Sequence, residues 1–183
     1  MIAKKMATLI FVSAFLLGCN TEVATLPSPE KLTELAIGNY CGMVLTEHEG
    51  PKAQLFEKGK NTPLWFTAVR DALAYTRLPG EGQSVVAIYV HDMGKAKSWE
   101  RPDTDGIWIL ASDAYYVINS EKRGGMGMTE VVPFGDREKA IQFMNEFGGT
   151  VVSYRDVPTK NLFPDFDEQN VDVSVRYTQE AVQ

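Results

Sequence analysis

The sequence predicts an α+β fold that consists of two β-β-α-β units in tandem. In each half of the chain, stretches typical of strands are followed by one stretch with apolar residues at helical spacing, and then by a further strand. The same order of elements occurs twice between residues 39 and 156, and a Pro-Gly or a Gly-Gly pair ends each helix. A repeated supersecondary unit accounts for both observations.

The first unit is assigned to residues 39–95. Residues 39–45 alternate in the manner of a strand, residues 47–50 predict a turn, and residues 52–57 predict a second strand. Residues 84–90 form an apolar run that predicts a buried strand.

A helix is predicted between the second and third strands of this unit. Thr62-Pro63 opens the helix, because proline is accepted in the first helical turn, and Pro79-Gly80 ends it. The apolar positions recur at helical spacing, at Leu64, Trp65, Ala68, Val69, Ala72 and Leu73.

The second unit is assigned to residues 96–156 and repeats this order. Strands are predicted at Ile107–Leu110 with Ala114–Ile118, and at Thr129–Phe134, before a helix from Asp136 through Phe147, the pair Gly148-Gly149 and a strand at Thr150–Tyr154. The chain then turns acidic and irregular, which predicts a C-terminal surface arm at residues 157–183.

Residues 1–18 have the features of a bacterial lipoprotein signal peptide. Lys4 and Lys5 form a short basic region, and Met6–Leu17 is a nearly continuous apolar run that is too short to span a bilayer. The run ends in Leu-Leu-Gly-Cys, which resembles the lipobox, so we expect cleavage before Cys19 and acylation of that cysteine. A plain signal peptide is the alternative interpretation.

The mature chain is therefore expected to be tethered to a membrane by lipid at its first residue. Residues 19–38 are assigned to a tether and linker, and Asn20 favours the outer membrane of a Gram-negative cell by the usual sorting rule. Loss of Lys4 and Lys5 changes the net charge from −6 to −8. This balance argues against a nucleic-acid partner and provides no polybasic patch for anionic headgroups.

One thiol then has no partner for an internal disulfide. With Cys19 acylated, Cys41 is the only other cysteine, in a compartment where paired cysteines are the norm. It is a buried inert thiol, an intermolecular bridge or a metal ligand. In a strand, residues two apart face the same side, so Cys41 and Met43 would point toward one atom. Thiolate and thioether sulfur select Cu(I) most clearly, whereas zinc would want more cysteine or histidine.

Further candidate ligands lie in two loops. Gly124-Gly125-Met126-Gly127-Met128 holds methionines in a glycine-rich loop, away from any apolar stripe, although a single methionine is more often core filler. His48 lies in a turn seven residues after Cys41, where a hairpin would fold its imidazole back toward the thiol. Alone it would be a solvated turn residue. His91, at the end of a strand, is expected to be structural.

The chain carries no recognisable catalytic signature, and we expect no enzyme. It has no Gly-x-Ser-x-Gly elbow, only two histidines with no ordered triad, and no phosphate-loop or dinucleotide fingerprint. The remaining alternative to a metal carrier is a lipid-anchored docking or structural protein whose thiol is incidental.

Several motifs together resemble the NosL family, the nitrous oxide reductase accessory lipoproteins. The resemblance runs from the lipobox to about Asp156, through Cys41-Gly42-Met43, His48, Gly50-Pro51-Lys52-Ala53-Gln54, Trp65 to Tyr75, Trp108-Ile109, Met126-Gly127, Pro133-Phe134 and Gly148-Gly149. It implies a periplasm-facing copper chaperone of denitrification that holds one Cu(I). With a membrane ABC-type assembly transporter, the chaperone would pass the ion toward the copper-sulfide centre of nitrous oxide reductase. The implied fold is the two-part β-β-α-β arrangement shared with organomercurial lyase.

The resemblance also implies a ligand set. Cys41 and Met43 match the family's cysteine and methionine, His48 matches its histidine, and Met126 matches its later methionine. Met128 stands where a small residue is expected and is not assigned, and the family pattern does not explain the acidic arm. A lyase-like enzyme is disfavoured, because the lyase route needs a second cysteine to relay the metal. A homodimer in which two molecules share one copper remains open.

Overall fold

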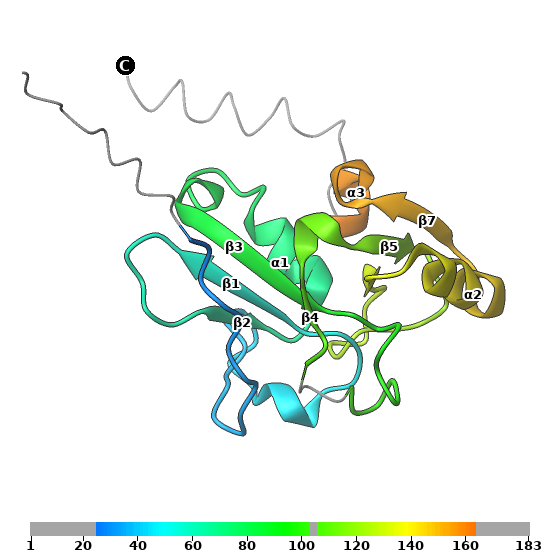
Figure 1. Cartoon of the computed structure of the whole chain (residues 1–183), viewed down its shortest axis with the longest axis horizontal. Helices are drawn as coiled ribbons and strands as arrows, with labels where there is room; N and C mark the ends of the chain where they lie inside the picture. Colours follow the sequence, from blue (N-terminus) through cyan, green and yellow to red (C-terminus); the bar gives the residue numbers. More distant parts are fainter. Residues whose placement is uncertain (1–24, 103–105, 164–183) are drawn as a thin grey trace, which may run out of the picture.

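The computed structural model describes residues 25–102 and 106–163 (Figure 1). These residues form a mixed α+β fold with two antiparallel sheets, so the predicted fold class is confirmed. The predicted signal peptide, the predicted lipidation site Cys19 and residues 164–183 of the predicted arm lie outside the described residues. Within the described ranges, no helix is long and apolar enough to cross a membrane.

The first sheet has the strand order β2-β1-β3-β4. Its strands are β1 (Ala53–Glu57), β2 (Leu64–Phe66), β3 (Val85–His91) and β4 (Trp108–Leu110). All residues of β1 are buried. This central strand pairs on both sides, and Leu55 lies opposite Leu64 of β2 and opposite Ile88 of β3.

The second sheet has the strand order β6-β5-β7. Its strands are β5 (Tyr115–Ile118), β6 (Val132–Phe134) and β7 (Thr150–Ser153). The two sheets share an arrangement, since β5 is flanked by β6 and β7 as β1 is flanked by β2 and β3.

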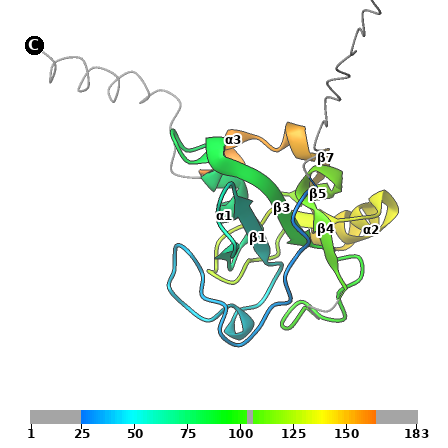
Figure 2. The same ribbon diagram turned by 60° about the vertical axis from the view of Figure 1, so that its left-hand side comes forward.

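The helices differ in burial. Helix α1 (Val69–Tyr75) is buried along most of its length and lies between the two sheets, where Val69, Leu55 and Tyr116 belong to one shared core (Figure 1). Helix α2 (Arg137–Phe147) packs on the second sheet, on the side away from the first (Figure 2).

The predicted helix of the second unit is confirmed by α2 and its two ends. The Asp136 carboxylate accepts hydrogen bonds from the backbone N–H groups of Glu138 (2.8 Å) and Lys139 (3.1 Å), which caps the first turn. Gly148 follows the last turn with a φ of 73°, a conformation that favours glycine.

Two predictions for the first unit are wrong. Residues 39–45 form no strand, because the chain turns at 39–41 and Gly42 adopts a left-handed φ of 66°. Residues 64–66, predicted as the start of the helix, form β2. The pairing of Trp65 with Gln54 and of Phe66 with Ala53 overrides the helical spacing, and α1 begins only at Val69.

The prediction that residues 107–110 belong with the second unit is also wrong. Strand β4 extends the first sheet, where its Ile109 lies opposite Val90 of β3. The sequence of a three-residue strand does not indicate which sheet the strand joins. Tertiary contacts alone determine that β4 pairs with β3.

The segments predicted as linker and arm are partly folded onto the body. Leu32 and Ala36 are buried, and the Gln54 side chain exchanges two hydrogen bonds with the backbone of Glu30 (2.7 and 3.0 Å). Val157 and Leu162, the latter in helix α3 (Thr159–Leu162), are buried in the core that both sheets share. The prediction of a surface arm is therefore wrong for residues 157–163. Burial of these apolar side chains stabilises the folded segment, although its polar residues favour contact with water.

Candidate metal site

Cys41 and Met43 lie in one tight turn. The Gly42 N–H donates to the Gly38 carbonyl (2.8 Å), and the Gly38 N–H donates to the Met43 carbonyl (2.9 Å). The left-handed φ of Gly42 permits this geometry without steric cost. The predicted strand that would point both sulfur side chains to one face is therefore absent, and Cys41 and Met43 lie in a turn instead.

The Cys41 thiol is half-buried and faces the start of helix α1. Its Sγ lies 3.5 Å from the hydroxyl oxygen of Thr67, the residue after β2. It also packs against Gly38, where an added Cβ would come within 2.5 Å of the sulfur. Cys41 is thus enclosed on two sides by defined partners and open on others.

His48 lies just after a short 3-10 turn (Leu45–Glu47), with its ring held in one orientation. Nδ1 lies 2.9 Å from the carbonyl oxygen of Gly125, and because a carbonyl only accepts, Nδ1 carries the hydrogen. The lone pair is then on Nε2. Metal-binding histidines commonly use this arrangement, in which one nitrogen donates to a carbonyl and the other binds the metal.

The glycine-rich loop 124–128 meets these residues at Gly125. A Cβ at Gly125 would lie 2.7 Å from His48 Cβ, 3.0 Å from the Glu49 carbonyl oxygen and 3.2 Å from the Thr67 carbonyl oxygen, so only glycine fits. The loop closes on itself through the Gly124 N–H, which donates to the Met128 carbonyl (2.9 Å). Met126, next to Gly125, is 38% exposed.

Thr67 is the common neighbour of the predicted ligand segments. Its hydroxyl contacts Cys41, and its carbonyl packs against Gly125. Gly125 in turn accepts the hydrogen bond of His48 and is the neighbour of Met126 in the chain. Segments far apart in the sequence therefore converge at one point. Met43 joins them only through the Cys41 turn and is 37% exposed.

Two buried ionisable residues behind this point were not predicted from the sequence. The Glu130 carboxylate accepts from the N–H groups of Arg70 (2.9 Å) and Val131 (2.8 Å), so it caps α1, whose own N-cap residue Ala68 has no capping side chain. Its second oxygen has no hydrogen-bond partner and faces Gly124. Burial raises the pKa of Glu130 to about 7.

Lys52 holds the other loop. Its Nζ donates to the carbonyl oxygens of Glu49 (2.7 Å) and Gly50 (2.6 Å), directly after His48. Burial lowers the pKa of Lys52 to about 8, against the attraction of Glu130 and Glu49. No local pattern indicates that a lysine and a glutamate are buried here; the only signal was the position of Lys52 in the motif that carries the family resemblance.

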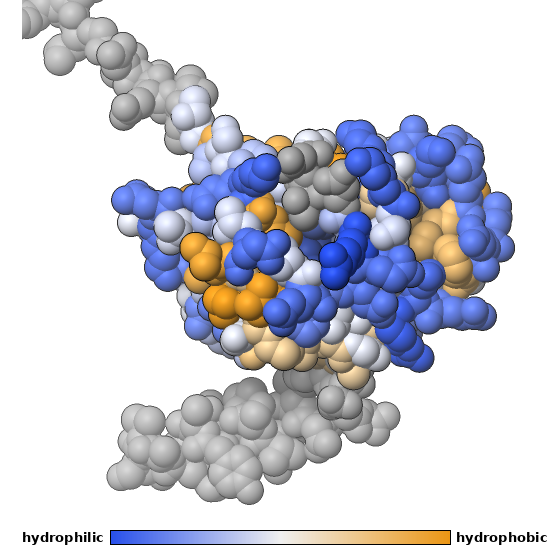
Figure 3. Space-filling view, turned by 90° about the horizontal axis from the view of Figure 1, so that it is seen from below, coloured by the Kyte–Doolittle hydropathy of each residue, from blue (hydrophilic) through white to orange (hydrophobic). Residues whose placement is uncertain are grey.

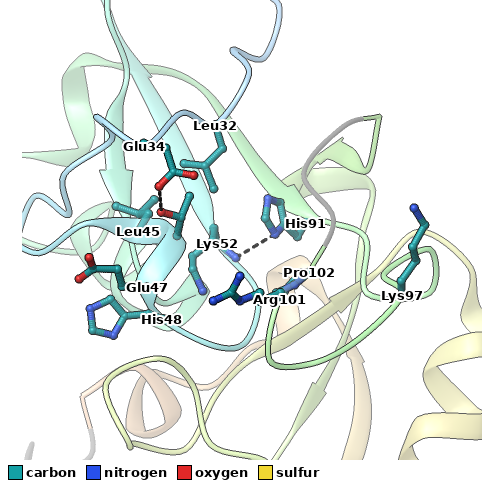
Figure 4. Close-up of a pocket in the computed structure, with 11 residues that line it drawn as sticks. Leu32, Glu34, Leu45, Glu47, His48, Lys52, His91, Lys97, Arg101 and Pro102 are labelled. Carbon is teal, nitrogen blue, oxygen red and sulfur yellow. Dashed lines mark hydrogen bonds between the residues drawn. The ribbon is translucent and has the colours of Figure 1, made fainter.

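A cavity of about 470 Å³ opens beside His48 (Figure 4). His91 lies in its wall, is fully buried, and accepts a hydrogen bond at Nδ1 from the Lys52 N–H (3.4 Å). Burial, with the charge of Lys52, lowers the pKa of His91 to about 3, so the ring is neutral at physiological pH. Its ring centroid lies 4.1 Å from that of Trp108, which agrees with the structural role expected for this histidine.

The surface around the site is apolar and sulfur-rich. Figure 3 shows a hydrophobic area bordered by hydrophilic residues on the face seen from below. The exposed large apolar residues of the two ligand loops and the segment before them are Leu35, Ile37, Tyr40, Met43, Met126 and Met128. In the part of the chain that the structure describes, no three His, Cys, Asp or Glu side chains come together as a metal group.

Known proteins resemble this chain over most of its length. A sequence profile of the NosL family matches residues 29–162. The copper-binding lipoprotein NosL of Achromobacter cycloclastes is 46% identical over 145 residues, which cover 79% of this chain and 75% of that protein. The copper-binding lipoprotein NosL of Stutzerimonas stutzeri is 34% identical over 119 residues, covering 65% and 60%. The crystal structure of the copper chaperone NosL from Shewanella denitrificans matches with a TM-score of 0.67 and 28% identity, covering 72% of this chain and 96% of that one.

Proposed function

The chain belongs to the NosL family, and we propose that it is a lipid-anchored copper chaperone, not an enzyme, that binds one Cu(I) through Cys41, Met43, His48 and Met126. The observation that carries the proposal is the convergence of the Cys41 turn, His48 and the Met126 loop around Thr67. Residues that are separate in sequence supply one thiol, one oriented imidazole and thioethers at this place.

The chemistry of these donors favours the monovalent ion. A thiolate and neutral thioethers are soft ligands and match Cu(I), and a neutral imidazole is compatible with it. Mixed ligands at low coordination number exchange readily, and the exposure of Met43 and Met126 leaves the ion accessible to a receiving protein. A carrier needs this combination, whereas a structural metal site is closed.

The lipid anchor is supported by the sequence and by the relatives. Leu-Leu-Gly-Cys at residues 16–19 resembles a lipobox, and both curated relatives are named as lipoproteins. We infer acylation of Cys19 and, from Asn20, attachment to the outer membrane on its periplasmic face.

We further infer that the chain delivers copper for assembly of the copper-sulfide centre of nitrous oxide reductase, through an ABC-type assembly transporter. Family membership supports this role, as does the exposed apolar surface around the ligand loops, which suits docking of a receiving protein. Cargo transfer requires such contact, because a Cu(I) ion released free in water would be lost to other ligands.

The two sheets also support a tandem arrangement of β-β-α-β units. β1, β2, α1 and β3 follow each other as β5, β6, α2 and β7 do, and each first strand is central in its sheet. We infer that each unit is associated with one ligand loop: the Cys41 loop leads into β1 of the first unit, and Met126 lies between β5 and β6 of the second. The likeness to organomercurial lyase remains a prediction of the family resemblance.

An anaerobic titration with Cu(I) against a competing chelator tests the proposal. The chain from residue 19 onward, carrying Cys19→Ser, should bind about one copper, and Cys41→Ala should abolish tight binding, since it removes the anionic ligand. His48→Ala, Met43→Ala and Met126→Leu should each weaken binding less. Affinity should fall with acidity, because protons compete for the thiolate and the imidazole.

The matched control is Met144→Leu, a methionine on α2 that packs in the core of the second sheet. It should bind like the parent. A parent protein that binds no copper would support a docking lipoprotein with an idle thiol instead, and one copper per two chains in a sizing experiment would indicate a shared site.

A further inference from the structure

We infer that Thr67 is a positioning residue of the metal site, which holds the Cys41 sulfur through its hydroxyl and donates a hydrogen bond to the thiolate when copper is bound. The inference deepens the proposed function and rests on it. It adds a residue that lies outside the predicted ligand set.

Thr67 is held in place by the elements on either side of it. The residue is nearly fully buried and sits between β2 and α1. On one side, Phe66 is paired with Ala53 of the central strand. On the other side, the buried Glu130 carboxylate fixes the first turn of α1 through the Arg70 N–H (2.9 Å). The backbone of Thr67 is thus fastened at both ends.

The hydroxyl of Thr67 has the Cys41 sulfur as its partner. Threonine hydroxyls near helix starts commonly bond the backbone of their own helix, as N-caps do. Here Ala68 is the N-cap residue of α1, and the Thr67 hydroxyl instead lies 3.5 Å from Cys41 Sγ. The helix does not need this hydroxyl, because Glu130 supplies the cap. The Thr67 hydroxyl is therefore available to hydrogen-bond the Cys41 sulfur.

Metal binding fixes the direction of the hydrogen bond between Thr67 and Cys41. In the metal-free protein either atom can donate. Binding of Cu(I) forms the sulfur–copper bond as the S–H bond breaks, the proton passes to the buffer, and no electron is transferred. A thiolate only accepts, so the Thr67 O–H must then be the donor. Hydrogen bonds to an ionised partner are the stronger kind, and residues that orient a metal ligand affect affinity substantially.

Thr67 also contacts the other ligand loop. The Thr67 carbonyl packs against Gly125, and Gly125 accepts the His48 hydrogen bond. One residue therefore contacts the thiol with its side chain and the Met126 loop with its backbone. Only the side chain distinguishes the ligand role from the scaffold role, which makes substitution of the hydroxyl alone informative.

The experiment compares Thr67→Val with Thr67→Ser in the chain from residue 19 onward that carries Cys19→Ser and so has a single thiol. Valine keeps the shape and removes the hydroxyl, and serine keeps the hydroxyl. We expect Thr67→Val to bind Cu(I) about tenfold more weakly, as typical for loss of such a partner. Its thiolate-to-copper charge-transfer band should move to longer wavelength, because the sulfur lone pairs lose a hydrogen bond. Thr67→Ser should restore both readouts.

A metal-free measurement separates this inference from the proposed function. The S–H stretching band in the infrared responds to hydrogen bonding at the Cys41 thiol, most strongly when the thiol donates, and it should shift in Thr67→Val but not in Thr67→Ser. The matched control is Thr46→Val, which removes a surface hydroxyl bonded to Glu34 (2.9 Å) and should change nothing.

If the parent binds no copper but its S–H band differs from that of Thr67→Val, the chaperone proposal is refuted and the contact between Thr67 and Cys41 is retained. Copper binding in Thr67→Val with parental affinity, absorption and S–H band would overturn the role of Thr67 and leave the chaperone intact. An equal loss in the valine and serine variants would also overturn it, since packing rather than the hydroxyl would then matter.

Discussion

The imidazole of His48 donates a hydrogen bond to the carbonyl oxygen of Gly125, which lies 77 residues further along the chain (2.9 Å). This bond joins a loop that precedes the first sheet to a loop of the second sheet. It fixes the tautomer of the histidine and the position of the residue beside Met126 at once. The arrangement makes the glycine, and not only the ligands, a requirement of the site.

Gly125→Ala should therefore damage both stability and copper binding. The new methyl group would lie 2.7 Å from His48 Cβ and 3.0 Å from the Glu49 carbonyl oxygen, so one loop must move away from the other. Overpacking of this kind costs about 1–3 kcal/mol, and Cu(I) affinity should fall with it. Chemical denaturation and the chelator titration measure the two effects.

Gly127→Ala is the matched control for that prediction. Gly127 has a left-handed φ of 73°, but an added Cβ would meet nothing within 4 Å. It should cost about 1 kcal/mol through backbone strain and leave copper affinity nearly unchanged. Equal affinities for the two alanine variants would contradict the steric argument.

The sequence was most informative where local rules decide the outcome. Asp136 and Gly148 bracket α2 as capping chemistry predicts, and the buried runs of β1 and β3 are strands as expected. It failed where contacts at long range decide. Residues 64–66 have helical spacing but pair with β1. It also failed at one local feature, since Gly42 turns a stretch that alternates like a strand.

The site follows the same division. Residue chemistry singled out Cys41 and Met43, because a thiol and a thioether stand out by type, and the family resemblance added His48 and Met126; this ligand set stays a prediction. The residues that hold them do not stand out. Thr67 lay inside a predicted helix, and the burial of Glu130 depends on α1 lacking its own cap, which only the packed structure reveals.

Met126→Leu and Met128→Leu should differ in their effect on copper. Leucine conserves much of the volume and removes the thioether, so both exchanges should cost little stability at these exposed positions. We expect Met126→Leu to weaken Cu(I) binding and Met128→Leu to leave it as in the parent. The chelator titration distinguishes them, and a larger loss for Met128→Leu would reassign the ligand.

Leu162→Ala should destabilise the protein by about 2–4 kcal/mol, as large-to-small exchanges in a core do. Leu162 is buried in the core that both sheets share, although its segment reads as an acidic arm. Leu35→Ala is the comparison, because Leu35 is 86% exposed and should cost almost nothing. Thermal and urea denaturation give both values. A Leu162→Ala variant as stable as the parent would mean that this segment lies on the surface.

His91→Phe should reduce the sensitivity of the fold to acid. The pKa of His91 is lowered to about 3 in the folded protein, so the unfolded chain takes up a proton that the native state refuses as the pH falls from 6.5 toward 3. Stability from this group is present above pH 6.5 and is lost through that window. Denaturant midpoints between pH 4 and 7 should show a slope smaller by about one proton in the variant. An unchanged slope would mean that His91 titrates normally.

Glu130→Gln should have the opposite dependence on pH. Burial raises the pKa of Glu130 to about 7, so the native state holds a proton that the unfolded chain releases above its ordinary pKa. The stability that this group contributes is present in acid and is lost as the pH rises to about 7. Glutamine imitates the protonated carboxyl, so the variant should match the parent near pH 5 and exceed it above pH 7, by at most about 3 kcal/mol.

Urea unfolding at pH 5 and pH 8 measures this difference, with the exposed Glu138→Gln on α2 as the control that should show no such change. The cap on α1 survives in the glutamine variant, because its carbonyl oxygen still accepts from the Arg70 N–H. A Glu130→Gln protein that is less stable than the parent at pH 8 would show that the ionised carboxylate has a favourable partner in the fold. The attraction between Glu130 and Lys52, whose ammonium is buried under the His48 loop, would then outweigh the cost of burying the charge.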